Sequence, residues 1–285
     1  MLRYRLAPIW RRANNLIASF CDRLPGFRAI LLHDISSKNN QALSDFLNYL
    51  VQNHEFINPD EAESFLAGSH PLSISSQGKL PCLLTFDDGF TSNLDVAVDI
   101  LERYNIKGLF FVSPGLIDLS ASEQRKAIKE LIFQSSGTSD QTLERLRLMS
   151  WAELAQLKMM GHTIGCHGMR HRRLSELDES NLYEEILMAG DLMDKRLDQT
   201  TDWYAFAFGD IQSINKQALE MISKRYRFCR SGIRRANYFA TPTHALCADA
   251  IDLEASLPYQ CLILEGGLDF LYTRKYKVLR SFLDD

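Results

Sequence analysis

The chain has 285 residues and a formal net charge of −4, with 46% hydrophobic and 24% charged residues. This length can bury one large core, and the composition is that of an ordinary globular domain. A net negative charge gives no overall attraction to phosphates, which argues against a nucleic-acid partner, and no apolar run reaches the roughly 18 residues of a membrane-spanning helix.

The N-terminal extension, residues 1–26, is basic, and its arginines alternate with apolar residues in a pattern typical of an amphipathic helix. It lacks the continuous apolar stretch of a signal peptide. Two interpretations remain open. We favour packing of this helix on the domain, and the alternative is a peripheral membrane contact through residues 1–20.

The six cysteines are scattered along the chain without a CxxC pair. Those within apolar segments, such as Cys82 in PCLLTF and Cys261 in QCLIL, resemble small core residues. We therefore expect reduced thiols and a cytoplasmic location. The other four cysteines are Cys21, Cys166, Cys229 and Cys247.

From residue 27 onward, short β-rich runs alternate with helical stretches. This alternation predicts a parallel sheet and one α/β catalytic domain over residues 27–285. Residues 113–149 interrupt it, and we expect them to form an insertion or lid over one face. Strands are predicted at 27–33, 81–86, 108–112, 162–167, 203–206 and 227–231, and helices at 41–51, 93–104, 151–160, 179–197 and 215–225. Ser92 and Ser150 are the predicted N-caps of two of these helices, the second with Glu153 in a capping box.

Three of the predicted strands end in ionisable residues directly after an apolar run. The carboxyl ends of barrel strands carry the active sites of α/β barrels, so a functional site is expected there. The residues are His33 and Asp34, Asp87 and Asp88, and His167 with His171.

Two histidines four residues apart, with a carboxylate, offer three ligands and leave open positions on a divalent metal. In an extended backbone the neighbouring Asp87 and Asp88 would point apart, one toward a metal and the other toward a substrate. Alone, the aspartates could form a tight turn, and the histidines could be surface residues. Their coincidence at successive strand ends favours a site.

Three segments carry a resemblance to a known family. Thr85–Gly89 reads TFDDG, and the His167–His171 pair is followed by LSEL at residues 174–177. Tyr204–Asp210 resembles a third motif, an aromatic turn that ends in glycine. In these motifs, and from about residue 29 to residue 231, the sequence resembles the polysaccharide deacetylases, the NodB-homology family also called carbohydrate esterase family four.

The resemblance implies a distorted (β/α) barrel that hydrolyses an acetyl group on a sugar. By position, Asp88, His167 and His171 would hold one divalent metal ion, usually zinc, with cobalt or nickel as alternatives. Asp87 would be the general base, and the backbone N–H of Phe208 would contact the oxyanion.

A general acid must also protonate the leaving amine. His33 follows an apolar strand and resembles the N-terminal histidine that has this role in the exopolysaccharide-processing branch of the family. The other interpretation of His33 is a hydrogen-bonded core histidine. His244, in PTHALCAD, is a weaker candidate for the acid.

The sequence departs from the family pattern at three positions. Gly168 replaces the usual Ser or Thr after the first metal histidine, and Ala207 stands where proline is common. More consequential is Ala205, because many relatives have an arginine there that orients the catalytic aspartate. Another cation must do this here, and Arg170 is one candidate, although it more resembles a solvated or substrate-facing charge.

The leading hypothesis is a metal-dependent hydrolase that removes an N-acetyl group from an amino sugar in a polysaccharide, glycolipid or glycan precursor. One alternative is hydrolysis of another non-peptide C–N bond on the same fold. A second alternative is a catalytically inactive relative that binds metal or glycan, which the altered third motif suggests. An oxygenase with two histidines and one carboxylate is disfavoured, because the predicted fold is α/β.

Overall fold

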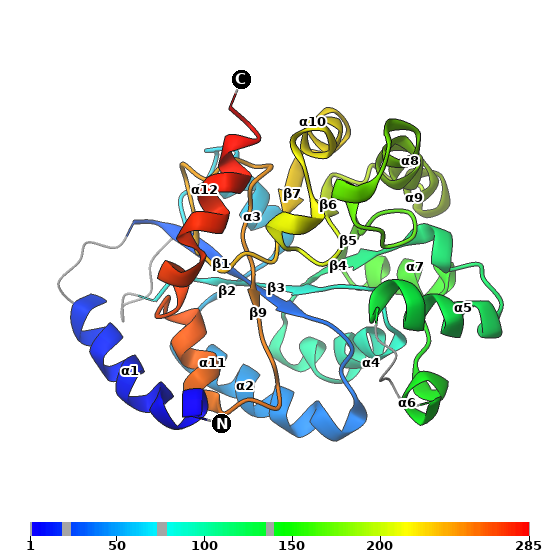
Figure 1. Ribbon diagram of the computed structural model, residues 1–285. Coiled ribbons are helices and arrows are strands. Elements are labelled where there is room, and N and C mark those ends of the chain that lie inside the picture. The colour runs from blue at the N-terminus through cyan, green and yellow to red at the C-terminus, as the bar shows by residue number, and fades with distance from the viewer. Residues whose placement is uncertain (1, 19–23, 73–78, 135–139, 285) are drawn as a thin grey trace.

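A mostly parallel β-sheet lies at the centre of the molecule and curls into a half-barrel (Figure 1). The computed structural model describes residues 2–18, 24–72, 79–134 and 140–284. The strand order is β7-β6-β5-β4-β3-β1-β8, with β2 beside β3 and β9 beside β1. The strands are β1 (Gly26–Leu32), β2 (Phe56–Ile57), β3 (Cys82–Phe86), β4 (Leu109–Val112), β5 (Thr163–Cys166), β6 (Trp203–Ala205), β7 (Phe228–Arg230), β8 (Asn237–Tyr238) and β9 (Asp249–Ala250). Of these strands in the described residues, β8 alone pairs antiparallel, with β1.

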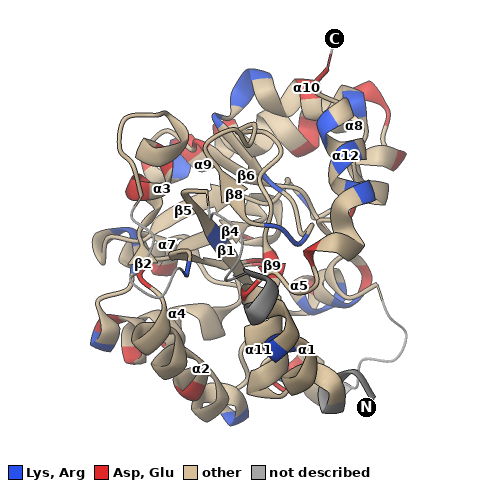
Figure 2. Cartoon of the chain, turned by 90° about the vertical axis from the view of Figure 1, so that its left-hand side faces the viewer, with Lys and Arg blue, Asp and Glu red and all other residues tan. Residues whose placement is uncertain are grey.

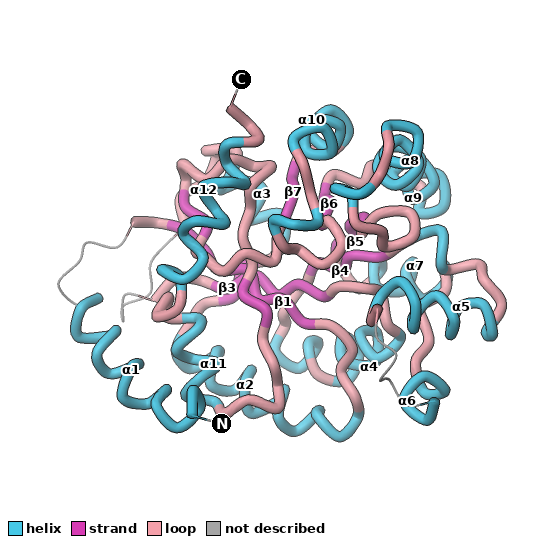
Figure 3. Tube along the Cα trace, viewed as in Figure 1, coloured by secondary structure: helices cyan, strands magenta, loops and turns pink. Residues whose placement is uncertain are grey.

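Helices surround this sheet on the outside of the molecule (Figure 3). The charged residues lie mainly on the helices and loops, while the strands are largely uncharged (Figure 2). The helices are α1 (Leu2–Ala18), α2 (Asn40–Asn53), α3 (Pro59–Leu66), α4 (Thr91–Asp99), α5 (Ala121–Ala127), α6 (Asp140–Arg145), α7 (Trp151–Met159), α8 (Glu179–Tyr183), α9 (Ala189–Leu197), α10 (Lys216–Arg225), α11 (Leu257–Leu264) and α12 (Thr273–Ser281). None of the helices in the described part of the chain is long and apolar enough to cross a membrane.

The predicted βα alternation is confirmed, and the α/β class with it. The strands β1, β3 and β4 are mainly apolar and buried on both faces, as expected for a parallel sheet covered by helices. Phe86 of β3 and Phe110 of β4 stack with ring centroids 4.6 Å apart, which joins two central strands. The capping box of Ser150 and Glu153 is also present at the start of α7.

Some elements differ from the sequence-based expectation. The predicted cap at Ser92 is wrong, because Phe90 is the N-cap of α4 and Ser92 lies inside the helix. Its hydroxyl donates instead to the Asp34 carboxylate at 2.9 Å. The two-residue strands β2, β8 and β9 are too short to produce a periodic pattern, and α11 is apolar on all sides, so its sequence does not show a helical period.

The segment 113–149 contains α5, α6 and the π-helical turn Ile128–Ile132. Its apolar side chains pack together with Phe90 into a small separate core beside the mouth of the half-barrel, and Arg145 of α6 donates to the Asp34 carboxylate at 2.6 Å. The buried members of that core are Phe90, Leu116, Ala127, Ile128, Ile132, Leu143, Leu146 and Leu148.

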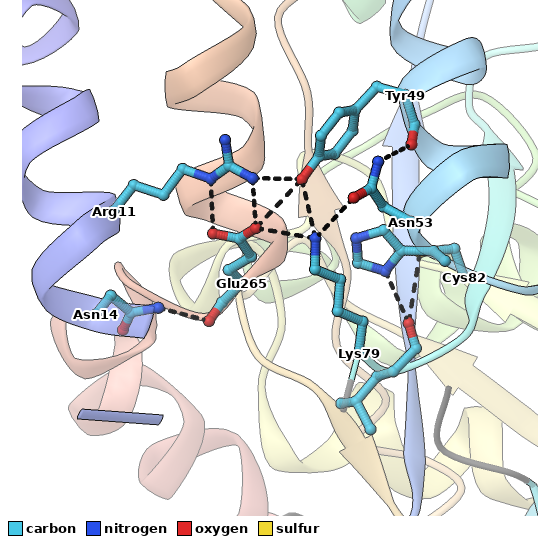
Figure 4. A network of polar contacts seen from close by, with 9 residues as sticks. Arg11, Asn14, Tyr49, Asn53, Lys79, Cys82 and Glu265 are labelled. Carbon is cyan, nitrogen blue, oxygen red and sulfur yellow. Dashed lines mark hydrogen bonds and ion pairs between the residues drawn. The ribbon is translucent and has the colours of Figure 1, made fainter. Parts of the chain in front are cut away.

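Helix α1 packs against α11 through a polar network (Figure 4). Arg11 donates two hydrogen bonds of 2.8 Å to the Glu265 carboxylate and a third, of 2.5 Å, to the Tyr49 hydroxyl. Asn14 donates to the Glu265 carbonyl oxygen at 2.9 Å. The favoured expectation for the extension, packing on the domain, is therefore met.

Among the described side chains of α1, the apolar residues Leu6 (39%), Ile9 (64%) and Trp10 (49%) are exposed. They are the apolar part that a membrane contact of residues 1–20 would need, and that contact stays a prediction. Residues 19–23 lie outside the described part of the chain, and with them Cys21. The other five cysteines are buried and free, in agreement with reduced thiols.

Replacing Arg11 with Ala is expected to lower the free energy of unfolding by about 1–3 kcal/mol, because the buried Glu265 carboxylate would lose its main partner. Urea unfolding measures the change. Arg12→Ala is the matched control, since Arg12 is exposed on the same helix turn, and a change within about 0.5 kcal/mol is expected there. Equal effects of the two substitutions would contradict the docking role of Arg11.

Candidate active site

A cavity of about 480 Å³ opens at the carboxyl ends of the central strands. The six residues to which the sequence assigned the main catalytic and metal-binding roles all line it, although they come from segments far apart in the chain. Leu31, Ile132, Phe133, Gly209 and Ala250 complete much of its wall. The six candidates are His33 after β1, Asp87 and Asp88 after β3, His167 and His171 after β5, and Phe208 after β6.

In the TFDDG segment, Thr85 and Gly89 fix the backbone that carries the two aspartates. The Thr85 hydroxyl donates to the Ile30 carbonyl at 2.9 Å and ties β3 to β1. Gly89 has a φ of +73°, and a Cβ there would lie 2.8 Å from Val112, so this turn requires glycine. The turn itself delivers both aspartates to the cavity.

Three cavity residues have backbone conformations that side chains other than glycine rarely adopt. Asp88, His171 and Phe208 have φ values of +72°, +59° and +65°. The expectation of an extended backbone through the two aspartates is therefore wrong at Asp88, where the chain turns. Such conformations persist where the surrounding structure holds them, and they cluster at functional sites.

Asp88, His167 and His171 are buried, and one ligand atom from each lies within 4.8 Å of the others. The Asp88 Oδ1 atom is 3.6 Å from His167 Nε2 and 3.3 Å from His171 Nε2. Among the described residues, no donor makes a hydrogen bond of good geometry to that oxygen. A buried carboxylate oxygen between two imidazole nitrogens, without such a bond, suits a shared cation.

The far side of each imidazole is held by a backbone carbonyl. His167 Nδ1 donates to Ala205 O at 2.7 Å, and His171 Nδ1 donates to Leu131 O at 3.0 Å, when each ring carries its proton on that nitrogen. This tautomer leaves both Nε2 lone pairs facing Asp88, as metal-binding histidines require. The Leu131 carbonyl comes from the π-helical turn Ile128–Ile132, so the 113–149 segment supports a candidate ligand.

Electrostatics in the cluster favours an anionic aspartate and a neutral first histidine. Burial lowers the pKa of His167 to about 4, which keeps its ring neutral. Burial also disfavours the charges of Asp88 and His171, but their mutual proximity outweighs it, so the pKa of Asp88 falls and that of His171 rises. This donor set fits one divalent metal ion such as zinc.

Asp87 is held by a residue that was not expected from the sequence. Arg230, at the end of β7, donates from Nη2 to both carboxylate oxygens of Asp87, at 2.5 and 2.6 Å. Both side chains are almost fully buried. The guanidinium also lies over the Phe111 ring, 4.8 Å from its centroid.

Arg230 therefore replaces the arginine that many relatives have at the position of Ala205. The two residues are direct partners in the register of β6 and β7, so the cation has moved to the neighbouring strand. The signal available in the sequence was an arginine within the predicted strand 227–231, because a buried charge needs a partner. Arg170, which the sequence suggested as the cation for Asp87, is 58% exposed and instead faces Glu184 at 3.8 Å.

His33 lies exposed at the rim of the cavity, beyond the end of β1. Helix α4 fixes its backbone: Asn93 Nδ2 donates to the His33 carbonyl at 2.9 Å, and the Ser92 hydroxyl accepts from the Ile35 N–H at 3.1 Å. The interpretation of His33 as a core histidine is therefore wrong. The weaker acid candidate, His244, bonds through Nε2 to the Tyr226 carbonyl and is not among the residues that line this cavity.

Phe208 also lines the cavity. It and Gly209 both have positive φ, so the backbone turns tightly at this point. The Phe208 ring lies between two cationic or ionisable groups, with its centroid 4.7 Å from that of His171 and 4.1 Å from the Arg173 guanidinium carbon.

The family model for polysaccharide deacetylase matches residues 75–226, more than half of the chain. The chain belongs to the polysaccharide deacetylase family. The match includes both aspartates, both histidines and Phe208, and it ends shortly before Arg230. No curated protein matches the sequence.

Solved structures of deacetylases share the fold of this family member. The deacetylase PplD of Streptococcus pyogenes, in complex with acetate, is 18% identical with a TM-score of 0.63, over 84% of this chain and 98% of that one. IcaB from Ammonifex degensii is 20% identical with a TM-score of 0.60, over 85% and 97%. A de-N-acetylase from Aggregatibacter actinomycetemcomitans is 13% identical with a TM-score of 0.63, over 83% and 99%. These similarities confirm the distorted barrel expected for a polysaccharide deacetylase.

Proposed function

We propose that this polysaccharide deacetylase is a metal-dependent hydrolase that removes an N-acetyl group from an amino sugar in a polysaccharide, glycolipid or glycan precursor. One observation carries the proposal. The Asp87 carboxylate, which a buried arginine holds, lies in the same cavity as the buried cluster of Asp88, His167 and His171. A protein that only bound metal would not need the first carboxylate.

In this proposal Asp88, His167 and His171 hold one divalent metal ion, with zinc as the first choice and cobalt or nickel as alternatives. When bound, such an ion supplies Lewis-acid chemistry at the acyl carbonyl. The neutral His167 and the two backbone carbonyls that orient the rings support this assignment.

Asp87 acts as the general base and accepts a proton from the attacking water. Arg230 orients this carboxylate, because a guanidinium that donates to both of its oxygens restricts its rotation. His167 Nε2 lies 3.8 Å from Asp87 Oδ2, so the base is next to the metal cluster.

The leaving amine needs a proton, and His33 donates it from the rim of the cavity. This is the side on which the sugar attached to the nitrogen must lie, since His33 is exposed to the entrance. The Phe208 backbone N–H stabilises the negative charge that develops on the acyl oxygen.

The inactive alternative loses its main support. It was motivated by the missing arginine at Ala205, and Arg230 supplies an equivalent cation to Asp87. The relatives named as a deacetylase in complex with acetate and as a de-N-acetylase favour removal of an N-acetyl group over hydrolysis of another amide. A cytoplasmic location remains part of the proposal.

The metal content of the purified protein, measured by mass spectrometry, tests the proposal first. We expect about one divalent ion per chain, and its loss in His167→Ala and Asp88→Asn. Acetate release from N-acetylated glycans then tests the reaction. Asp87→Asn should keep the metal and lower kcat by about 10²–10⁴-fold. A site that cannot be loaded with zinc, cobalt or nickel would refute the enzymatic function.

A further inference from the structure

A buried carboxylate lies against the turn that joins the two candidate metal histidines. It belongs to Glu185, whose side chain has no exposed surface, in the π-helical turn Glu184–Met188. Removing a charge from water is costly unless hydrogen bonds and an opposite charge compensate. None of the reaction steps proposed above uses this carboxylate.

The side chain of Glu185 contacts the histidine turn and the residue directly after it. Its two carboxylate oxygens both accept from the Arg170 backbone N–H, at 3.1 Å. The Arg172 guanidinium donates to Oε1 from Nε at 2.8 Å. The main-chain carbonyl of Glu185 accepts from the Met169 N–H at 3.2 Å.

Gly168 completes this arrangement. Its φ is +80°, and a Cβ built on it would lie 2.7 Å from Glu185 Oε2 and 3.3 Å from the Tyr204 hydroxyl. The glycine therefore leaves room for the carboxylate as well as for the backbone turn. This gives a physical reason for glycine at a position where relatives have Ser or Thr.

We propose that Glu185 is a positioning residue that fixes the separation of His167 and His171 and thereby sets the metal affinity. The inference rests on the proposed metal site. Of the three residues between the two histidines, Met169 and Arg170 donate hydrogen bonds to Glu185, and Gly168 leaves space for its carboxylate. Glu185 therefore fixes the conformation of the turn. Groups that support ligands from outside the coordination shell commonly change metal affinity by 10–100-fold.

The test is the zinc affinity of the metal-free Glu185→Gln protein, measured by competition with a chromophoric chelator. We expect zinc to bind about 10–100-fold more weakly than in the unsubstituted protein. Glutamine keeps the size and one acceptor oxygen, but it removes the negative charge that faces the Arg172 guanidinium, and its NH₂ group cannot accept from the Arg170 N–H.

Glu184→Gln is the matched control. Glu184 is the preceding residue in the same turn and also faces Arg172, at 3.2 Å, and Arg170, at 3.8 Å, but it is partly exposed, and its carboxylate faces these two side chains rather than the backbone between the histidines. Its zinc affinity should equal that of the unsubstituted protein. A general loss of packing would instead lower the urea midpoint of the metal-free protein without changing the zinc affinity of the folded fraction.

Arg172→Gln keeps the inference testable if Glu185→Gln does not fold. It removes the charge partner of Glu185 at a partly exposed position, and zinc should bind about tenfold more weakly. If the folded variants bind zinc as tightly as the unsubstituted protein, Glu185 has no positioning role, while the proposed function stands. If the unsubstituted protein itself binds no zinc, the proposed function and this inference both fail.

Discussion

Replacing Arg230 with Ala is expected to lower kcat for acetate release by about 100-fold and to leave the metal content unchanged. The reason is that Arg230 is the group that holds both oxygens of Asp87, and a misplaced catalytic group commonly costs a factor of this size. Steady-state acetate release and mass spectrometry of the same preparation measure the two quantities. Loss of a buried charge partner should also cost about 3–5 kcal/mol of stability, so the assay is run well below the unfolding transition.

A second substitution separates the catalytic effect from the loss of stability. Ala205 is the register partner of Arg230, at the position where relatives have arginine. The double variant Ala205→Arg/Arg230→Ala should therefore recover most of the lost rate. A folded Arg230→Ala protein with unchanged kcat would show that Asp87 needs no arginine for the reaction.

Replacing His33 with Gln is expected to lower kcat by about 10²–10⁴-fold, again without loss of the metal. Glutamine is similar in size but cannot donate a proton to the leaving amine near neutral pH. The measurement is acetate release under saturating substrate, with metal content determined in parallel.

His244→Gln is the control for that experiment. His244 is the other histidine considered for the acid role, and its Nε2 atom bonds to the Tyr226 carbonyl away from the cavity. Its substitution should leave kcat near the unsubstituted value. The acid role would belong to another group if His33→Gln kept full activity, and to His244 if the two variants behaved in the opposite way.

The predicted metal ligands and the predicted base lie together in the structure. They could be predicted because each lies in a short sequence motif directly after an apolar strand. Asp87 and Asp88 follow an apolar strand in the next two positions, and His167 and His171 share one short turn after another strand. Parallel strands deliver such residues to the same edge of a sheet, whatever the details of the packing. The main elements were predictable for the same reason, since apolar runs and capping residues specify them over a few neighbouring positions.

Helix starts and short elements were less predictable. Serine is a common N-cap residue, but the Ser92 hydroxyl bonds to Asp34, and α4 begins at Thr91. The sheet edges formed by β8 and β9 depend on pairing with β1, and two residues carry no period from which to infer this. In these places a tertiary contact outweighs the local preference.

The sequence by itself determined the fold class, the family and the residues of the candidate site. The tertiary structure decided which groups hold those residues: Arg230 reaches Asp87 across 143 positions, Leu131 supports His171, and Glu185 lies against the histidine turn. The reason is that a strand's own residues specify its apolar pattern, whereas its neighbours follow from the order in which all strands assemble. Arg230 meets Asp87 only because β7 is placed beside β6 at the edge of the half-barrel.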